Sequence, residues 1–166
     1  MNIYDQFRLD NKVAVVTGGS KGIGRGIALA FADCGADVAI LARRQDELNH
    51  VVKEIEDKGR KGLGISADVM DMKSIPKALD KVCEEMGHLD IMVNNAGGNL
   101  DRKMYSLPEI SIEKFDEQLT LNMKTKWWGS QQAAERMTDG GRIINIISVA
   151  AHRASPGFGV YSAANL

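Results

Sequence analysis

Two hydrophobic patterns alternate along this chain. Short, continuous apolar runs are typical of strands that are covered on both faces of a parallel sheet. The runs predict five strands, at residues 12–17, 38–42, 63–67, 89–94 and 142–148. Between the strands, apolar residues recur at the i, i+3, i+4, i+7 spacing of an amphipathic helix. These stripes predict helices that end near Cys34, Gly59, Gly87 and Met137, the last of which begins at Ser111.

This alternation of strands and helices predicts the fold class. We expect an α/β fold in which helices cover both faces of a doubly wound parallel sheet, joined by right-handed crossovers. The expected order of the five strands is 3-2-1-4-5. A ligand crevice is expected where this order reverses, at the carboxyl ends of strands one and four. No linker or repeat divides the sequence, so we predict a single domain over residues 1–166.

The composition narrows the possible partners and the location. The chain has 166 residues, of which 44% are hydrophobic and 26% charged, with a net charge of −1. This balance gives no reason to expect nucleic acid or a membrane surface as a partner. Without an apolar N-terminal segment or a run of about 20 apolar residues, a cytoplasmic protein is expected. Cys34 and Cys83 are expected to be buried, reduced thiols, and no metal-ligand spacing is present.

A glycine-rich stretch, residues 17–24, follows the first predicted strand and opens the first predicted helix. It reads Thr17-Gly18-Gly19-Ser20-Lys21-Gly22-Ile23-Gly24. Glycines at positions 18, 22 and 24 permit a tight turn and a close approach of backbone to a ligand. The helix that follows presents free N–H groups and a partial positive charge, which favour a phosphate. The alternative is a glycine-rich turn that binds nothing.

Three further candidates are expected at the same crevice. Asn94-Asn95-Ala96-Gly97 ends strand four, although Asn and Gly are also common in an ordinary turn. Ser148 ends strand five, where its hydroxyl would face the crevice, and Tyr161 follows thirteen residues later; the alternative is a capping serine and a loop tyrosine. Asn122 lies on the apolar face of the long helix and therefore needs an internal partner. It is either a satisfied core asparagine or a group that positions a water or a side chain.

Taken together, these stretches resemble the short-chain dehydrogenase/reductase family, whose members have a Rossmann-like fold. Residues 17–24 are similar to the family's TGxxxGxG loop, and Asn94-Asn95-Ala96-Gly97 to its NNAG motif. Ser148, Tyr161 and Asn122 stand at the family's positions for the catalytic Ser, Tyr and Asn. The resemblance implies hydride transfer between a nicotinamide cofactor and a carbonyl or alcohol substrate.

The resemblance also implies a role for each matching residue. Tyr161 is the general acid or base at the substrate oxygen, Ser148 polarises that oxygen, and Asn122 holds a water in a proton relay. The residues implied in cofactor binding are Thr17, Gly18, Ser20, Lys21, Gly22, Ile23, Gly24, Arg43, Asp68, Val69, Asn95, Ala96 and Gly97. Of these, Asp68 and Val69 are expected against the adenine.

The end of strand two indicates which nicotinamide cofactor to expect. An acidic residue there bonds the ribose 2′-hydroxyl of NAD, whereas an arginine accommodates the 2′-phosphate of NADP. The chain reads Leu41-Ala42-Arg43-Arg44, with no carboxylate before Asp46. Arg43 and Lys21 therefore favour NADP over NAD. The alternative is two solvated charges without a ligand.

The chain departs from the family pattern at its end. The YxxxK motif has lysine where this sequence has Asn165, and the sequence ends at Leu166, before the last strands of the family fold. In the family, that lysine holds the nicotinamide ribose and favours the ionised tyrosine. We therefore expect an oxidoreductase chain with little or no activity. A non-catalytic NADP(H)-binding module and an unstable fragment are the alternatives. The homo-oligomer usual in the family is doubtful here, and the identity of the substrate cannot be inferred.

Overall fold

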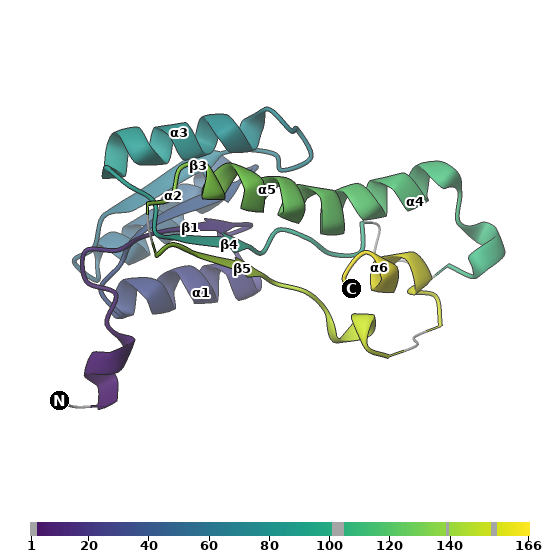
Figure 1. The fold of residues 1–166 in the computed structure, drawn as a ribbon, viewed down its shortest axis with the longest axis horizontal. Coiled ribbons are helices and arrows are strands. Elements are labelled where there is room, and N and C mark those ends of the chain that lie inside the picture. Colours follow the sequence, from purple (N-terminus) through teal and green to yellow (C-terminus); the bar gives the residue numbers. More distant parts are fainter. Residues whose placement is uncertain (1–2, 101–104, 139, 154–155) are drawn as a thin grey trace.

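A parallel sheet forms the centre of the molecule in the computed structural model, which describes residues 3–100, 105–138, 140–153 and 156–166 (Figure 1). The strands follow the order β3-β2-β1-β4-β5, and every neighbouring pair is parallel. The predicted fold class and strand order are therefore confirmed. The strands are β1 (Val13–Thr17), β2 (Asp37–Ala42), β3 (Gly62–Ser66), β4 (Ile91–Asn94) and β5 (Arg142–Asn145).

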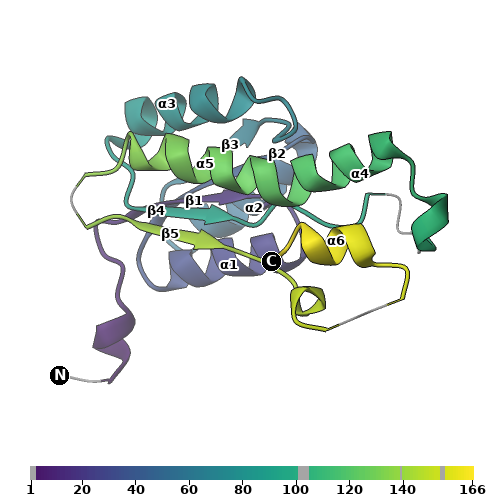
Figure 2. The same ribbon diagram turned by 45° about the vertical axis from the view of Figure 1, so that its right-hand side comes forward.

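Helices cover both faces of the sheet (Figure 2). The α-helices are α1 (Gly22–Asp33), α2 (Gln45–Glu56), α3 (Ser74–Met86), α4 (Ile112–Leu119), α5 (Thr125–Ala134) and α6 (Gly159–Ala163). A π-helical turn, η3 (Thr120–Lys124), joins α4 to α5. Short 3-10 turns are η1 (Ile3–Phe7), η2 (Leu107–Glu109) and η4 (Val149–Ala151). Among the described residues, no helix is long and apolar enough to cross a membrane.

The core is divided into two layers by the sheet. Successive residues of a strand point to opposite faces, so β1 contributes to both layers. Val13 and Val15 pack with apolar residues of α3 and α5, whereas Ala14 and Val16 pack with those of α1 and α2. All five residues of β1 are buried. This is why the sequence of β1 is continuously apolar instead of alternating.

Two elements differ from the sequence-based prediction. The predicted helix from Ser111 to Met137 is divided into α4, η3 and α5, and its last turn ends at Ala134. Ser111 does cap α4, because its side chain accepts a hydrogen bond from the backbone N–H of Lys114. β5 ends at Asn145 instead of residue 148, and all four of its residues are exposed. It is the edge strand, so β4 alone pairs with it.

The cysteines also differ from expectation, since Cys34 and Cys83 are free thiols that are half-buried rather than fully buried. Burial still raises the pKa of the Cys83 thiol, so it is held in the protonated form.

A carboxylate fastens the sheet at the amino ends of its strands. Asp90 immediately precedes β4, and its Oδ2 accepts a hydrogen bond of 2.8 Å from the backbone N–H of Val13. Its Oδ1 accepts one of 3.0 Å from Lys12. The Asp90 carbonyl accepts a bond from the backbone N–H of Arg142, so this residue contacts the first residues of both β1 and β5. Burial alone raises the pKa of Asp90, but the bonds from Val13 and Lys12 and the nearby His88 lower it overall.

We expect Asp90→Ala to lower the free energy of unfolding by about 1–3 kcal/mol, because the Val13 N–H loses its partner in the sheet. The loss should be measured by urea unfolding at neutral pH. Because the folded-state pKa of Asp90 is depressed, its contribution is present above the unfolded-state pKa and is lost as pH falls through the folded value. The difference in the free energy of unfolding between the native chain and Asp90→Ala should therefore shrink in acid.

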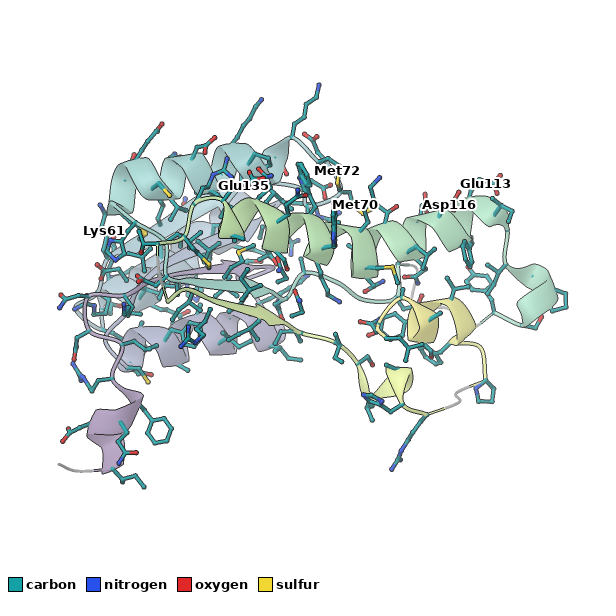
Figure 3. The ribbon with its side chains drawn as sticks, viewed as in Figure 1. Lys61, Met70, Met72, Glu113, Asp116 and Glu135 are labelled. Carbon is teal, nitrogen blue, oxygen red and sulfur yellow. The ribbon has the colours of Figure 1, made fainter. Side chains whose placement is uncertain are left out.

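The matched control is Asp116→Ala, which removes an exposed carboxylate on α4 (Figure 3). Equal stability losses in the two variants would contradict the role assigned to Asp90.

Candidate functional site

A long cleft of about 1070 Å³ runs along the carboxyl ends of the strands. It is formed by the turn after β1, the ends of β2, β3 and β4, and residues of η3, α5 and α6. The predicted site residues that line it are Gly18, Ser20, Lys21, Ile23, Gly24, Arg43, Asp68, Val69, Asn95, Ala96, Gly97, Asn122 and Tyr161. Segments that are distant in sequence are thus brought to one surface, as the strand order predicts.

Three predicted site residues do not line this cleft. Thr17 is buried beneath it, and Gly22 supplies backbone conformation, with a φ of +55° that favours glycine. Ser148 lies in the segment after β5, where its hydroxyl accepts a 3.2 Å hydrogen bond from the backbone N–H of Ala150 and caps η4. Because β5 ends early, Ser148 is three residues beyond the strand instead of at its end.

The glycine-rich turn has the backbone shape that an anion site requires. Gly18 has a φ of +66°, and a Cβ on Gly24 would collide with the Gly18 carbonyl oxygen. Glycine at position 24 therefore allows α1 to start directly against the turn. No side chain caps the N-terminus of α1. Its first backbone N–H groups thus have no side-chain acceptor, and they lie beside the cleft.

A set of hydrogen bonds joins this turn to the loop after β4. The Thr17 hydroxyl accepts bonds of 3.0 Å from the backbone N–H groups of Asn95 and Ala96. In return, the Asn95 amide donates a 2.9 Å bond to the Thr17 carbonyl. We call these contacts the Thr17–Asn95 clamp. They hold the ends of β1 and β4 together at the point where the strand order reverses.

Positive charge dominates one end of the cleft, near β2. Arg43 and Lys21 are exposed there, and among the described residues neither side chain has a hydrogen-bond or ion-pair partner. Glu47, which the sequence analysis did not single out, also lines this end. Its carboxylate accepts a 3.0 Å bond from Ser20 and pairs with Arg44. The i, i+3 spacing of Arg44 and Glu47 was the signal for that pairing.

The side chain of Asn122 is a satisfied, buried amide. It is 1% exposed, its Oδ1 accepts a 2.8 Å bond from the backbone N–H of Gly98, and its Nδ2 donates 3.0 Å to the Gly98 carbonyl. Nδ2 also lies 3.1 Å from the Gln118 carbonyl. Asn122 therefore joins the π-helical turn to the loop after β4. π turns inside helices often occur at functional sites.

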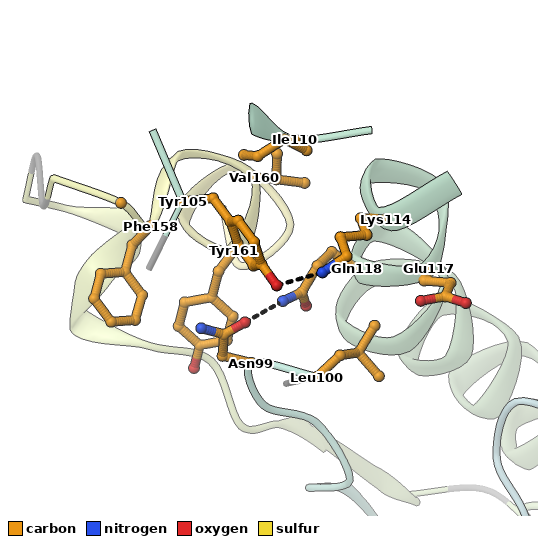
Figure 4. Close-up of a pocket in the computed structure, with 11 residues that line it drawn as sticks. Asn99, Leu100, Tyr105, Ile110, Lys114, Glu117, Gln118, Phe158, Val160 and Tyr161 are labelled. Carbon is orange, nitrogen blue, oxygen red and sulfur yellow. Dashed lines mark hydrogen bonds between the residues drawn. The ribbon is translucent and has the colours of Figure 1, made fainter. Parts of the chain in front are cut away.

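Tyr161 lies between the long cleft and a second, smaller cavity of about 300 Å³ (Figure 4). The Phe158 ring meets the Tyr161 ring edge to face, with centroids 6.1 Å apart. Across the smaller cavity, the Lys114 ammonium donates a hydrogen bond to the Tyr105 hydroxyl. Apolar side chains of Leu100 and Val160 complete this mostly apolar space beside the tyrosine.

Lys126 is a second residue that the sequence analysis missed. It lines the long cleft from α5 but is only 6% exposed. The signal in the sequence was its i, i+4 spacing from Asn122, which places both residues on one helix face. Burial lowers the pKa of the Lys126 ammonium. Within the described residues there is no group of three or more His, Cys, Asp or Glu side chains that could hold a metal ion.

The contribution of the Thr17–Asn95 clamp to stability can be tested by substitution of Thr17. Thr17→Val keeps the side-chain shape but removes the acceptor of two backbone N–H groups, so we expect a loss of about 1–3 kcal/mol in the free energy of unfolding. Thr17→Ser is the matched control, because it keeps the hydroxyl, and it should be clearly less destabilised. Urea unfolding of both variants measures the difference. If the valine variant were as stable as the serine variant, the hydroxyl would not hold the clamp.

Comparison with known proteins identifies the family. A family profile described as short chain dehydrogenase matches residues 12–165. The chain is 39% identical over 150 residues to 2-dehydro-3-deoxy-D-gluconate 5-dehydrogenase of Escherichia coli, with 89% of the chain covered. The structure superposes on a short chain dehydrogenase of Burkholderia cenocepacia in complex with NADP, with a TM-score of 0.88, 39% identity and 95% of the chain covered.

A second solved structure is 7α-hydroxysteroid dehydrogenase complexed with NADH and 7-oxo glycochenodeoxycholic acid. Its TM-score is 0.92, with 31% identity and 99% of the chain covered. The chain spans 57% of the length of the Escherichia coli enzyme and 64% of each of the two solved chains. The match to the family extends over nearly all of residues 1–166. The chain therefore belongs to the short-chain dehydrogenase/reductase family of oxidoreductases.

Proposed function

We propose that this chain binds NADP(H) and carries the hydride-transfer site of an oxidoreductase that acts on a carbonyl or alcohol of a small molecule. The observation that carries the proposal is the glycine-rich turn with its uncapped helix, held by the Thr17–Asn95 clamp against a long cleft. Backbone N–H groups at such a helix start suit a pyrophosphate. Gly18 and Gly22, both with positive φ, keep side chains away from that position.

The two ends of the cleft support a dinucleotide in one orientation. Asp68 and Val69 line the end beyond β3 with Arg43, which suits an adenosine, whereas Tyr161 and Asn122 line the opposite end. A bound nicotinamide supplies or accepts the hydride. The residues of this chain orient it and move a proton at the substrate oxygen.

NADP is the cofactor that we propose, with NAD as the alternative. Arg43 and Lys21 lie where a 2′-phosphate requires positive charge, and an arginine fork suits phosphate geometry. Glu47 does not oppose this assignment, because Ser20 and Arg44 already engage its carboxylate. The Burkholderia cenocepacia structure is described with NADP and the hydroxysteroid dehydrogenase with NADH, so both cofactors occur among similar proteins.

The proton chemistry is assigned to Tyr161, supported by Ser148 and Asn122. Tyr161 lies at the junction of the cleft and the smaller cavity, where a substrate carbonyl would meet the nicotinamide. The Ser148 hydroxyl accepts from the Ala150 N–H and keeps its own proton to donate to a substrate oxygen. The amide of Asn122 is engaged by Gly98, so a relay water would bind its main-chain carbonyl.

Asn165 favours a second candidate function, a module that binds NADP(H) without turnover. Its amide donates a 2.8 Å bond to the Tyr161 carbonyl and lies 3.1 Å from Lys126, so it occupies the position of the family's lysine without the charge. The two free cysteines suit a reducing compartment, and we propose a cytoplasmic location.

The cofactor assignment predicts that the chain binds NADPH more tightly than NADH. Arg43→Ala should weaken NADPH binding about 10-fold, because one charge-assisted contact to the 2′-phosphate is lost, and should leave NADH binding unchanged. Isothermal titration calorimetry measures both affinities. Lys53→Ala, which removes an exposed lysine of α2 outside the cleft, is the control and should change neither. An equal loss for NADPH and NADH in Arg43→Ala would contradict the assignment.

The absence of a lysine at position 165 predicts slow turnover that a lysine there should restore. With NADPH and a panel of ketones and aldehydes, the native chain should oxidise NADPH at or near the background rate, and Asn165→Lys should raise that rate at least 10-fold. Tyr161→Phe added to Asn165→Lys should abolish the gain. Turnover by the native chain in the ordinary enzyme range of about 1–10³ s⁻¹ would show that Asn165 does not limit it.

A further inference from the structure

Lys126 is a buried cation without a buried anion. Its ammonium donates a 3.1 Å hydrogen bond to Oδ1 of Asn165, which is itself 3% exposed. Among the described residues, no carboxylate lies within ion-pair distance of it. Lysine is rarely buried unless it is paired, because moving an ammonium out of water is costly. A purely structural explanation for this residue is therefore weak.

The ammonium also has hydrogen-bonding capacity left. A protonated lysine has three N–H donors, and the bond to Asn165 uses one of them. Lys126 lines the long cleft together with Gly97, Asn122 and Tyr161. A Cβ placed on Gly97 would lie 3.6 Å from the Lys126 Nζ and 2.9 Å from the Asn122 Oδ1. Because Gly97 has no side chain, the ammonium is not screened from the cleft on that side.

Lys126 and Tyr161 are linked through Asn165. One end of the Asn165 amide accepts from Lys126, and the other donates 2.8 Å to the Tyr161 carbonyl. The ammonium thus lies at the Tyr161 end of the cleft, opposite the end that carries Arg43 and Lys21. The family's YxxxK motif has its lysine at position 165, and among the described residues the charged group bonded to Asn165 is Lys126.

We propose that Lys126 is the cationic ligand of the nicotinamide half of the cofactor, donating to its ribose hydroxyls in place of a lysine at position 165. This inference rests on the proposed NADP(H)-binding function. It makes Lys126 a cofactor-binding residue whose charge comes from α5 instead of from the residues that follow α6. A cation in a partly water-excluded cleft strengthens a hydrogen bond to a hydroxyl more than an exposed one does.

The test compares two ligands by isothermal titration calorimetry. NADPH reaches both ends of the cleft, whereas adenosine 2′,5′-bisphosphate has the 2′-phosphate but no nicotinamide. Lys126→Met should weaken NADPH binding about 10-fold and leave the bisphosphate affinity unchanged, because one charge-assisted bond at the nicotinamide end is lost. Lys124→Met, a neighbouring exposed lysine, is the matched control and should change neither affinity.

Rescue provides a second readout that a merely structural lysine would not show. In the double variant Lys126→Met with Asn165→Lys, the charge returns from position 165, and NADPH affinity should recover to within about threefold of the native chain. Thermal unfolding of each variant accompanies the titrations. Replacing a buried, unpaired ammonium by an apolar side chain of similar length removes the cost of its desolvation, so Lys126→Met should not unfold earlier. If it fails to fold, Lys126→Gln takes its place with the same expectations.

The outcomes separate this inference from the proposed function. If the native chain binds neither ligand, the proposed function fails and the inference falls with it. If the native chain binds NADPH and Lys126→Met binds it equally well, only the inference is overturned. An equal loss of NADPH and bisphosphate binding, or a loss without rescue by Asn165→Lys, would show that Lys126 supports the fold of the cleft instead of the cofactor.

Discussion

The structure depends on how the ends of β1 and β4 are held together. These two strands are neighbours in the sheet, although Thr17 and Asn95, which join their ends, are 78 positions apart in the sequence. The Thr17 hydroxyl accepts from two consecutive backbone N–H groups, and the Asn95 amide returns a bond to the Thr17 carbonyl. This exchange satisfies buried polar groups and sets the shape of the glycine-rich turn. Together with the pairing of β1 and β4, it brings the uncapped start of α1 and the loop after β4 to one cleft.

The charged side chains at the two ends of the cleft differ in how far they are exposed to water. Arg43 and Lys21 are exposed, so water and salt weaken their electric fields. Lys126 is buried, and its charge is screened less. The amide of Asn122, bonded on both sides to Gly98, joins the π-helical turn to the β4 loop, and α5 begins directly after that turn. The helix break and the position of Lys126 are therefore connected.

The edge of the sheet contrasts with this ordered centre. β5 is isoleucine-rich yet exposed, with Ile143 38% and Ile144 41% accessible. A side chain of β4 secures it, since Asn94 donates a 2.9 Å bond to Asn145. An exposed apolar edge strand is a potential site of association between chains. The same early end of β5 leaves Ser148 in a loop, where its neighbours and not the strand set its orientation.

The strand order, the helices on both faces of the sheet, the glycine-rich turn and the family could all be inferred from the sequence alone. These follow from local apolar periodicity and short motifs, which report burial and backbone conformation directly. Three contacts came only from the folded chain: Ser20 donates to Glu47, Asn122 is bonded to Gly98, and Lys126 meets Asn165 across 39 positions. No local pattern contains these contacts, because packing of distant segments decides which polar groups meet once water is excluded.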